Sequence, residues 1–172
     1  MKMIRAILFD WDETLAHTRD CVVEAMEYVL KKYGKEAWNI TKKKYRDPQK
    51  SLKDNFPNFF GDEYMKAYNE YMEYYVKYAQ YKVIPMEYAE DFLQFCNKHK
   101  IDLYIVSNKE KSLLLKEVEV CFPEICFKNI LGNGDAVENK PSPEPVWEAL
   151  RDVKYKINSD NVWLIGDSKQ DT

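Results

Sequence analysis

The chain has 172 residues, which is enough for one domain or for one core with a modest insertion. Its net charge of −3 at pH 7 argues against nucleic acid as the main partner, because nucleic-acid binding relies on a basic surface. No apolar stretch approaches the length of about 20 residues that a transmembrane helix needs, and the N-terminus shows no signal-peptide pattern.

The cysteines and histidines do not form a metal-binding pattern. No two of the four cysteines stand in a Cys-x-x-Cys pair, and only two histidines are present to complete a zinc-binding set. All four cysteines lie inside or beside apolar runs, so we interpret them as small, reduced core residues of a cytoplasmic protein: Cys21, Cys96, Cys121 and Cys126.

The first elements along the chain are a strand and a helix. Residues 4–9 form a short, almost continuous apolar run, which is typical of a strand buried on both faces. Thr18 or Asp20 can cap the helix that follows, and Gly34 can end it. Residues 35–60 are polar and interrupted by prolines, which predicts short helices and loops.

A tyrosine-rich helix is expected at residues 62–81. Five of its tyrosines recur at alternating intervals of four and three residues, which places them on one helical face. They are Tyr64, Tyr68, Tyr71, Tyr75 and Tyr78. We interpret this face as buried within a helical subdomain; a dimer surface, or hydroxyls that reach a substrate, are the alternatives. The basic run at residues 42–46 is interpreted as a solvated surface, with contact to an anionic substrate as the alternative.

The second half of the chain alternates between strands and helices. Strands are expected at residues 101–106, 127–131 and 162–165, and helices at about 89–96, 109–120 and, after three prolines, 146–153. Such alternation predicts an α/β fold with a parallel sheet. Residues 16–84 lack strand-like runs, so we expect a helical insertion there and a core built from residues 1–15 and 85–172.

Four polar clusters follow the expected strands. They are Asp10 to Thr14, Ser107 with Asn108, Lys140 with Pro141, and Gly166 with Asp167, the last joined by Asp171 four residues later. In open parallel sheets, ligands bind beyond the carboxyl ends of the strands, so these side chains are expected to share one pocket. Each cluster alone is an ordinary turn or helix cap, and the information lies in the ordered set.

The residue types in this pocket suit phosphoryl transfer. Two carboxylates as close as Asp10 and Asp12 cannot both stay ionised cheaply unless a cation joins them, and Mg²⁺ prefers such oxygen ligands. Lys140 adds a positive charge for phosphoryl oxygens, and Ser107 adds a hydroxyl donor. Asn108 and the N-terminus of the helix expected after it add amide donors for an anion. An aspartate can also act as a covalent nucleophile and form an aspartyl-phosphate. These residues predict a Mg²⁺-dependent phosphatase.

As a set, these motifs resemble those of the haloacid dehalogenase superfamily, and most of all its phosphoglycolate-phosphatase-like branch with a helical C1-type cap. The resemblance runs from about residue 4 to residue 172 and is carried by residues 8–15, 106–109, 140–145 and 165–168, with Asp171. It implies a Rossmann-like parallel-sheet core, with an all-helical cap inserted between the first and second motifs.

The resemblance also implies catalytic roles. Asp10 is the implied nucleophile. Asp12 is implied to protonate the leaving oxygen and then to activate the water that attacks the aspartyl-phosphate. Thr14 and Ser107 are implied to position the phosphoryl group, and Lys140 to neutralise charge on the nucleophile and the phosphoryl group.

A metal site is implied in the same way. The resemblance assigns Mg²⁺ to the Asp10 carboxylate, the Asp12 main-chain carbonyl and Asp167. Asp171 is implied to support the metal or its waters, or to orient Lys140. All four aspartates are therefore candidate metal-site residues.

Three features depart from the family's pattern. Glu13 stands where many members carry glycine, and His17 and Thr18 occupy positions often held by aspartate and serine. We interpret His17 as a surface turn residue, with a cap hinge or a substrate contact as the alternatives. The family normally continues past its fourth motif with a further helix and strand, so we expect C-terminal elements of a longer parent to be missing here.

The leading hypothesis is a phosphatase that hydrolyses a small phosphorylated metabolite through an aspartyl-phosphate. Asp12 argues against a dehalogenase, because dehalogenases of the family lack that second aspartate. A phosphomutase of the β-phosphoglucomutase type and a non-catalytic phosphate- or partner-binding protein are the alternatives. Neither nucleic acid nor a membrane is expected as a partner, and the sequence leaves the substrate and the oligomeric state open.

Overall fold

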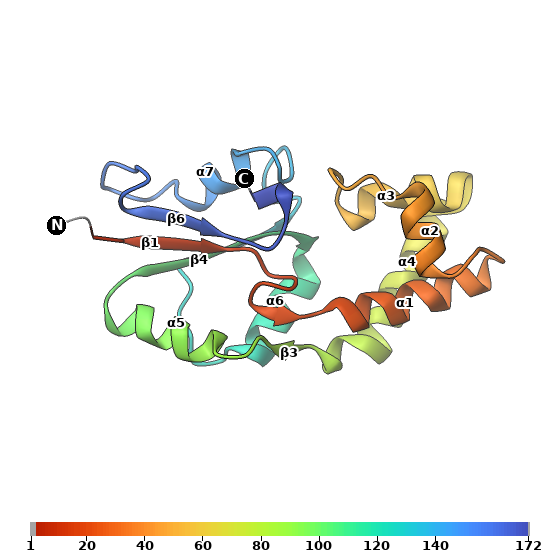
Figure 1. Ribbon diagram of the computed structural model, residues 1–172, viewed down its shortest axis with the longest axis horizontal. Coiled ribbons are helices and arrows are strands. Elements are labelled where there is room, and N and C mark those ends of the chain that lie inside the picture. The colour runs from red at the N-terminus through yellow and green to blue at the C-terminus, as the bar shows by residue number, and fades with distance from the viewer. Residues whose placement is uncertain (1–2, 172) are drawn as a thin grey trace. The chain divides into compact units, whose positions relative to one another are not determined.

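In the computed structural model, which describes residues 3–171, the chain forms two compact units (Figure 1). One unit is built from the residues up to His17 together with those from Ile84 onward, and the other from Thr18–Val83. Two short strands, β2 (Ala16–His17) and β3 (Ile84–Pro85), pair in antiparallel fashion where the chain leaves the first unit and returns to it. His17 is exposed in β2.

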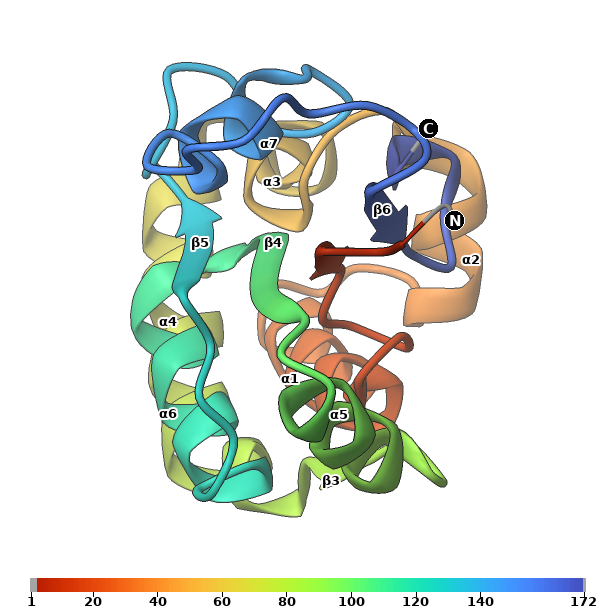
Figure 2. The same cartoon turned by 90° about the vertical axis from the view of Figure 1, so that its left-hand side faces the viewer.

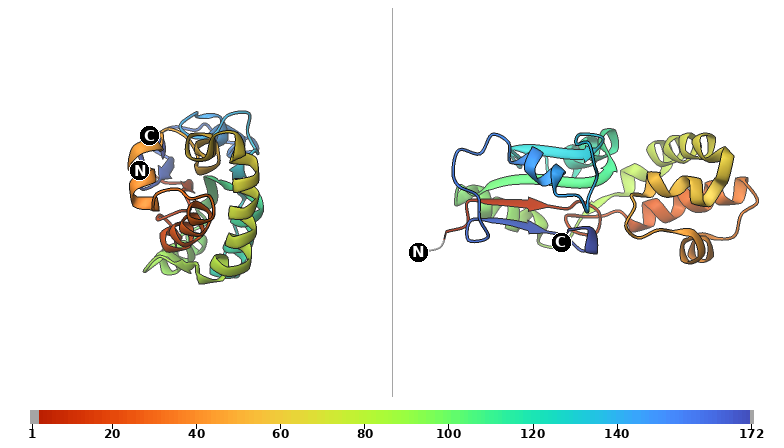
Figure 3. Two further views of the ribbon diagram at one scale, coloured as in Figure 1. Left: turned by 90° about the vertical axis from the view of Figure 1, so that its right-hand side faces the viewer. Right: turned by 90° about the horizontal axis from the view of Figure 1, so that it is seen from above.

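Four strands among the described residues form a parallel sheet in the order β5-β4-β1-β6. They are β1 (Ala6–Phe9), β4 (Asp102–Glu110), β5 (Asn129–Asn133) and β6 (Val162–Ile165). Every residue of β1 is buried, as expected of an apolar strand with a neighbour on each side. Figure 3 shows the four strands side by side in the view from above. The expected α/β fold with a parallel sheet is therefore confirmed.

Helices cover both faces of this sheet (Figures 1 and 2). They are α5 (Ala89–Lys98), α6 (Lys111–Cys121) and α7 (Glu144–Ala149), followed by a 3₁₀ turn at Lys169–Asp171. On one face, α7 packs over Ala6 and Leu8. On the other face, Phe9 meets Phe92 of α5 edge to face, with ring centroids 6.2 Å apart. Because successive strand residues point to opposite faces, β1 contributes alternately to two cores.

The second unit is a helical subdomain with an aromatic core. Its elements are α1 (Arg19–Lys32), α2 (Trp38–Tyr45), α3 (Leu52–Phe60), a 3₁₀ turn (Gly61–Glu63), α4 (Tyr64–Tyr74), a π-helical turn (Tyr75–Ala79) and a 3₁₀ turn (Gln80–Lys82). Phe56 of α3 is fully buried, stacks on Phe60 and meets the ring of Tyr71 edge to face. Such ring burial stabilises helices that are too short to persist alone.

The tyrosine face is buried only at its centre. Tyr71 and Tyr75 are buried, whereas Tyr64 and Tyr78 are exposed. Our interpretation of a buried face is therefore right for the middle of the stripe and wrong for its ends. Regular α-helical geometry gives way to the π-helical turn after Tyr74, and this shifts the angular phase of the residues that follow.

Three other expectations differ from the structure. β4 runs to Glu110 instead of ending near Val106, because Glu110 pairs with Asn133 of β5 after an irregularity in the ladder, and α6 begins correspondingly later. α7 has 6 residues, so Val153 lies beyond it. Cys126 is exposed, so its assignment to the core is wrong, while the other three cysteines are buried. No helix among residues 3–171 is long and apolar enough to cross a membrane.

Candidate active site

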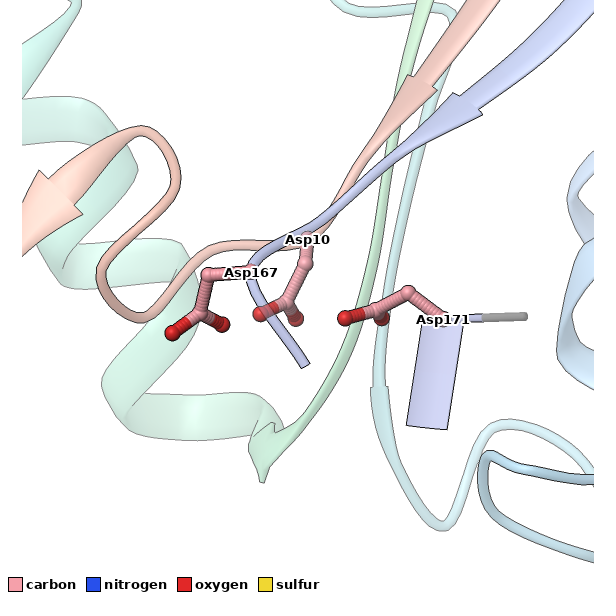
Figure 4. A group of neighbouring side chains, drawn as sticks. All are labelled: Asp10, Asp167 and Asp171. Atoms are coloured by element: carbon pink, nitrogen blue, oxygen red, sulfur yellow. The ribbon is translucent and has the colours of Figure 1, made fainter. Parts of the chain in front are cut away.

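Three aspartates converge at the carboxyl end of the sheet (Figure 4). Asp10 directly follows β1, Asp167 follows β6, and Asp171 lies in the final 3₁₀ turn. β1 and β6 pair in register to their last residues, and the N–H of Asp10 donates to the Ile165 carbonyl over 2.8 Å. One carboxylate oxygen from each aspartate lies within 4.8 Å of those of the other two. The strand register therefore brings together acidic groups that are far apart in the sequence.

Gly166 permits the close approach of Asp171. A Cβ atom on residue 166 would lie 2.2 Å from Cγ of Asp171 and 2.3 Å from its Oδ2. Ser168 donates to the same Oδ2 from its main-chain N–H over 3.1 Å and from its hydroxyl over 2.8 Å. The Asp171 carboxylate is thereby fixed against the turn that carries Asp167.

Lys140 is a buried cation between two of these carboxylates. Its Nζ donates to Oδ1 of Asp10 over 2.7 Å and to Oδ1 of Asp171 over 2.6 Å. The Lys140 side chain is only 3% exposed, and a charge buried in this way requires pairing because its desolvation is costly. Asp171 thus lies in the cluster with Asp10 and Asp167, and it also contacts Lys140 directly.

The surroundings of Asp10 disfavour its charged form. Burial raises the pKa of Asp10 from 3.8 to about 6; the positive charge of Lys140 lowers it, and the negative charges of Asp12 and Asp171 raise it. Burial, and then the charge of Asp171, also raise the pKa of Asp167. A divalent cation would relieve both costs, because it stabilises ionised carboxylates and prefers oxygen ligands. The donor set therefore fits a hard divalent cation.

Asn108 makes contacts different from those expected. Its Oδ1 accepts from the main-chain N–H of Lys140 over 2.9 Å, and its Nδ2 donates to the Lys140 carbonyl over 2.8 Å and to Oε1 of Gln170 over 3.2 Å. The side chain thus joins β4 to the Lys140 segment. Because β4 continues past Asn108, the expected helix N-terminus does not lie there. Ser107 is buried, and its Oγ accepts from the Lys109 N–H over 3.2 Å.

Asp12 lies apart from the cluster of Asp10, Asp167 and Asp171. Its Oδ1 accepts a hydrogen bond from Nζ of Lys109 over 2.9 Å, and it does not belong to the three gathered aspartates. Oγ1 of Thr14 is buried and has no hydrogen-bond partner within residues 3–171, which is uncommon for a buried hydroxyl. Glu13 has a φ of +61°, in the left-handed region, which is why glycine suits this position.

The partners of Asp12 are residues that sequence reasoning missed. Nζ of Lys109 also contacts Oε2 of Glu117 over 3.1 Å, and Nε1 of Trp11 donates to that same oxygen over 2.7 Å. Glu117 is buried on the apolar side of α6. The sequence signal that could have identified it is an acidic residue within the apolar stripe of a helix.

Sequence comparisons agree with this geometry. The family model described as haloacid dehalogenase-like hydrolase matches residues 7–172. A phosphoglycolate phosphatase from Aquifex aeolicus is 29% identical over 171 residues, which cover 98% of this chain and 78% of that protein. Pyrophosphatase PpaX from Oceanobacillus iheyensis is 26% identical over 168 residues, which cover 98% of this chain and 77% of that protein.

Solved structures share the fold. A haloacid dehalogenase-like hydrolase from Bacteroides fragilis superposes with a TM-score of 0.83 at 25% identity, over 98% of this chain and 80% of that chain. A variant of CbbY from Rhodobacter sphaeroides, in complex with xylulose-1,5-bisphosphate, superposes with a TM-score of 0.80 at 20% identity, with the same coverage of 98% and 80%. The family expected from the motifs is confirmed, and the chain belongs to the haloacid dehalogenase-like hydrolases.

Proposed function

We propose that this chain is a Mg²⁺-dependent phosphatase that hydrolyses a small phosphorylated metabolite through an aspartyl-phosphate. The observation that carries the proposal is the grouping of Asp10, Asp167 and Asp171 with the buried Lys140 at the carboxyl end of the sheet. Acidic oxygens beside a fixed cation suit a phosphoryl group and a divalent cation together. The names of the phosphoglycolate phosphatase and pyrophosphatase relatives support the same class of reaction.

Asp10 supplies the nucleophilic oxygen in this proposal. Lys140 holds Oδ1 of Asp10 and places positive charge beside the phosphoryl oxygens. As the bond from Asp10 to phosphorus forms, the bond to the leaving oxygen breaks, and Asp12 gives that oxygen a proton. Asp12 then takes a proton from the water that attacks phosphorus, and the bond from phosphorus to Asp10 breaks to release phosphate and the free Asp10 carboxylate. Thr14 and Ser107 position the phosphoryl group with their hydroxyls.

The metal-site residues are Asp10, Asp167 and the main-chain carbonyl of Asp12, with Asp171 in support. When bound there, Mg²⁺ supplies positive charge that stabilises phosphoryl oxygens and neighbouring carboxylates. Asn108 holds the Lys140 segment through its two main-chain hydrogen bonds, so that the ammonium faces these carboxylates.

We infer the substrate class from the names of the relatives, which support it as part of this proposal. One relative is named for phosphoglycolate, another for pyrophosphate, and the CbbY variant was crystallised with a sugar bisphosphate. Phosphorylated two- to five-carbon metabolites and pyrophosphate are therefore the first compounds to screen. We propose the helical unit Thr18–Val83 as the cap that selects among them. Transfer of phosphate to a sugar instead of water would identify a phosphomutase.

The test is hydrolysis of p-nitrophenyl phosphate with Mg²⁺, with EDTA, and with EDTA followed by excess Mg²⁺. We expect activity that EDTA abolishes and Mg²⁺ restores. Asp10→Asn keeps an oxygen acceptor for Lys140 and should stay folded while losing turnover. Activity that survives EDTA argues against the metal site, and turnover by Asp10→Asn near the wild-type rate argues against the nucleophile. A folded chain without any activity toward this ester or the metabolites above would contradict the proposal.

A further inference from the structure

A buried chain of polar contacts leads from the interior of the first unit to Asp12. Nε1 of Trp11 donates to Oε2 of Glu117 over 2.7 Å, and Nζ of Lys109 contacts that same oxygen over 3.1 Å. The Lys109 ammonium also donates to Oδ1 of Asp12 over 2.9 Å. Trp11 is itself fixed by Phe122, whose ring it meets edge to face with centroids 5.8 Å apart. The four polar groups therefore form one connected series.

This series is closed at one end and open at the other. The side chain of Glu117 is 0% exposed and that of Lys109 is 6% exposed, whereas that of Asp12 is 38% exposed. Of these three side chains, Asp12 is therefore by far the most accessible to solvent or a substrate. Each residue deeper in the series serves to hold the next one outward.

A purely structural ion pair is the competing explanation. Taking two charges out of water is costly, and apolar residues of similar size often stabilise a core as well or better. The Lys109–Glu117 pair is therefore poorly explained by stability alone. Its ammonium reaches outward to a partly exposed carboxylate, which a pair serving only the core would have no reason to do.

We propose that Lys109 and Glu117 are positioning residues that hold Asp12 for proton transfer to the leaving group. The inference rests on the proposed function, in which Asp12 is the acid. Lys109 fixes Oδ1 of Asp12 and leaves Oδ2 to carry the proton that passes to the leaving oxygen. The same contact keeps the Asp12 side chain apart from the cluster of Asp10, Asp167 and Asp171, although Asp12 is only two positions from Asp10 in the sequence. Glu117, anchored by Trp11, fixes the position of the Lys109 ammonium.

The leaving group provides a readout that a general structural defect would not change. Nitrophenolate departs readily without a proton, whereas the alkoxide of benzyl alcohol requires one, and the two phosphate esters are similar in size. The value of kcat/KM reports on the steps up to transfer of the phosphoryl group to Asp10, in which the leaving oxygen is protonated. A misplaced Asp12 should therefore lower kcat/KM for benzyl phosphate selectively.

The experiment compares kcat/KM for benzyl phosphate and p-nitrophenyl phosphate in the presence of Mg²⁺. For Lys109→Met we expect a loss of about 10- to 100-fold with benzyl phosphate and of roughly threefold or less with p-nitrophenyl phosphate, since a positioned acid contributes about 10²- to 10⁴-fold. Lys109→Arg retains a cation and should recover most of the benzyl phosphate activity. Asp12→Asn sets the upper limit of the selective loss.

Two further variants keep the test decisive. Lys109→Met leaves the buried Glu117 charge without this partner, which destabilises the fold. The double variant Lys109→Met with Glu117→Gln removes both charges and retains an acceptor for Trp11. It should show the same selective loss. Lys111→Met is the matched control, because Lys111 pairs with Asp135 over 2.6 Å instead, and the ratio of the two kcat/KM values should not change.

The outcomes separate this inference from the proposed function. A folded double variant in which the ratio of the two kcat/KM values equals that of the wild-type protein would overturn the positioning role. It would leave the proposed function standing. Wild-type protein that hydrolyses neither ester would overturn the proposed function and this inference with it. Far-ultraviolet circular dichroism and thermal unfolding establish that each variant compared is folded.

Discussion

The raised pKa of Asp10 predicts that divalent-cation binding weakens in mild acid. With a pKa of about 6 in the metal-free protein, about nine-tenths of Asp10 is ionised at pH 7 but only about one-tenth at pH 5. A cation that binds only the ionised form therefore loses about tenfold in apparent affinity, or ~1.4 kcal/mol, between these two values. Burial also raises the pKa of Asp167, and this shift weakens cation binding in acid in the same direction.

Isothermal titration of Mg²⁺ at pH 5, 6 and 7 measures this dependence directly. Titration in two buffers of different ionisation enthalpy also counts the protons released, and we expect proton release to be greatest at the lowest pH. Asp10→Asn should bind Mg²⁺ more weakly and with a smaller pH dependence. Equal dissociation constants at pH 5 and pH 7 in the wild-type protein would refute the reasoning.

The same pKa shift fixes how metal-free stability depends on pH. The folded pKa of about 6 lies above the ordinary value of 3.8, so the native state binds the proton more tightly than the unfolded chain does. The stability that Asp10 contributes is therefore present below about pH 4 and is lost as the pH rises through 6. Thermal unfolding in EDTA should reveal this loss, and Mg²⁺ should offset it above pH 6 because it binds only the folded state.

Three substitutions test the supports of the site. Gly166→Ala places a Cβ atom 2.2 Å from Cγ of Asp171, so we expect that carboxylate to move and Mg²⁺ affinity to fall about tenfold or more, as measured by titration. Asn108→Ala removes two hydrogen bonds to the main chain of Lys140 and should lower the free energy of unfolding by about 1–3 kcal/mol, as well as kcat; an unchanged kcat would argue against its supporting role. Glu13→Gly relieves a left-handed φ of +61° and should raise stability by about 0.5–1 kcal/mol in urea unfolding, whereas a loss would mean that the Glu13 side chain makes a contact that outweighs the strain.

Local sequence patterns were sufficient where short-range physics decides the outcome. The strand expected at residues 162–165 is observed at Val162–Ile165, because a brief apolar run that begins and ends with a β-branched residue and lies between polar turns favours a strand. The extent of β4 was not predictable in this way. Its last residue, Glu110, is held in the strand by pairing with β5, and the local sequence of one strand does not identify the strand with which it pairs.

In the site, too, the sequence predicted which residues gather but not which hydrogen bonds they make. The carboxyl-end rule correctly anticipated that Asp10, Asp167 and Asp171 would lie together, since parallel strands bring their ends to one edge. The contacts of Asn108 were not foreseen, because its partner Lys140 lies 32 residues away. Those hydrogen bonds depend on how two loops are placed, which residue type and spacing do not encode.

Two lysines divide the acidic groups of this site between two environments. Lys140 is buried between Asp10 and Asp171, while Lys109 lies between Asp12 and Glu117. Two aspartates only two residues apart, which would otherwise compete for one cation, are thereby each given a separate positive partner. Asp10 therefore lies with Asp167 and Asp171, while Asp12 is held apart from them, and this separate placement suits the two different roles of a two-carboxylate mechanism. Loss of Lys140 should therefore affect the metal site first, and loss of Lys109 the protonation of the leaving group.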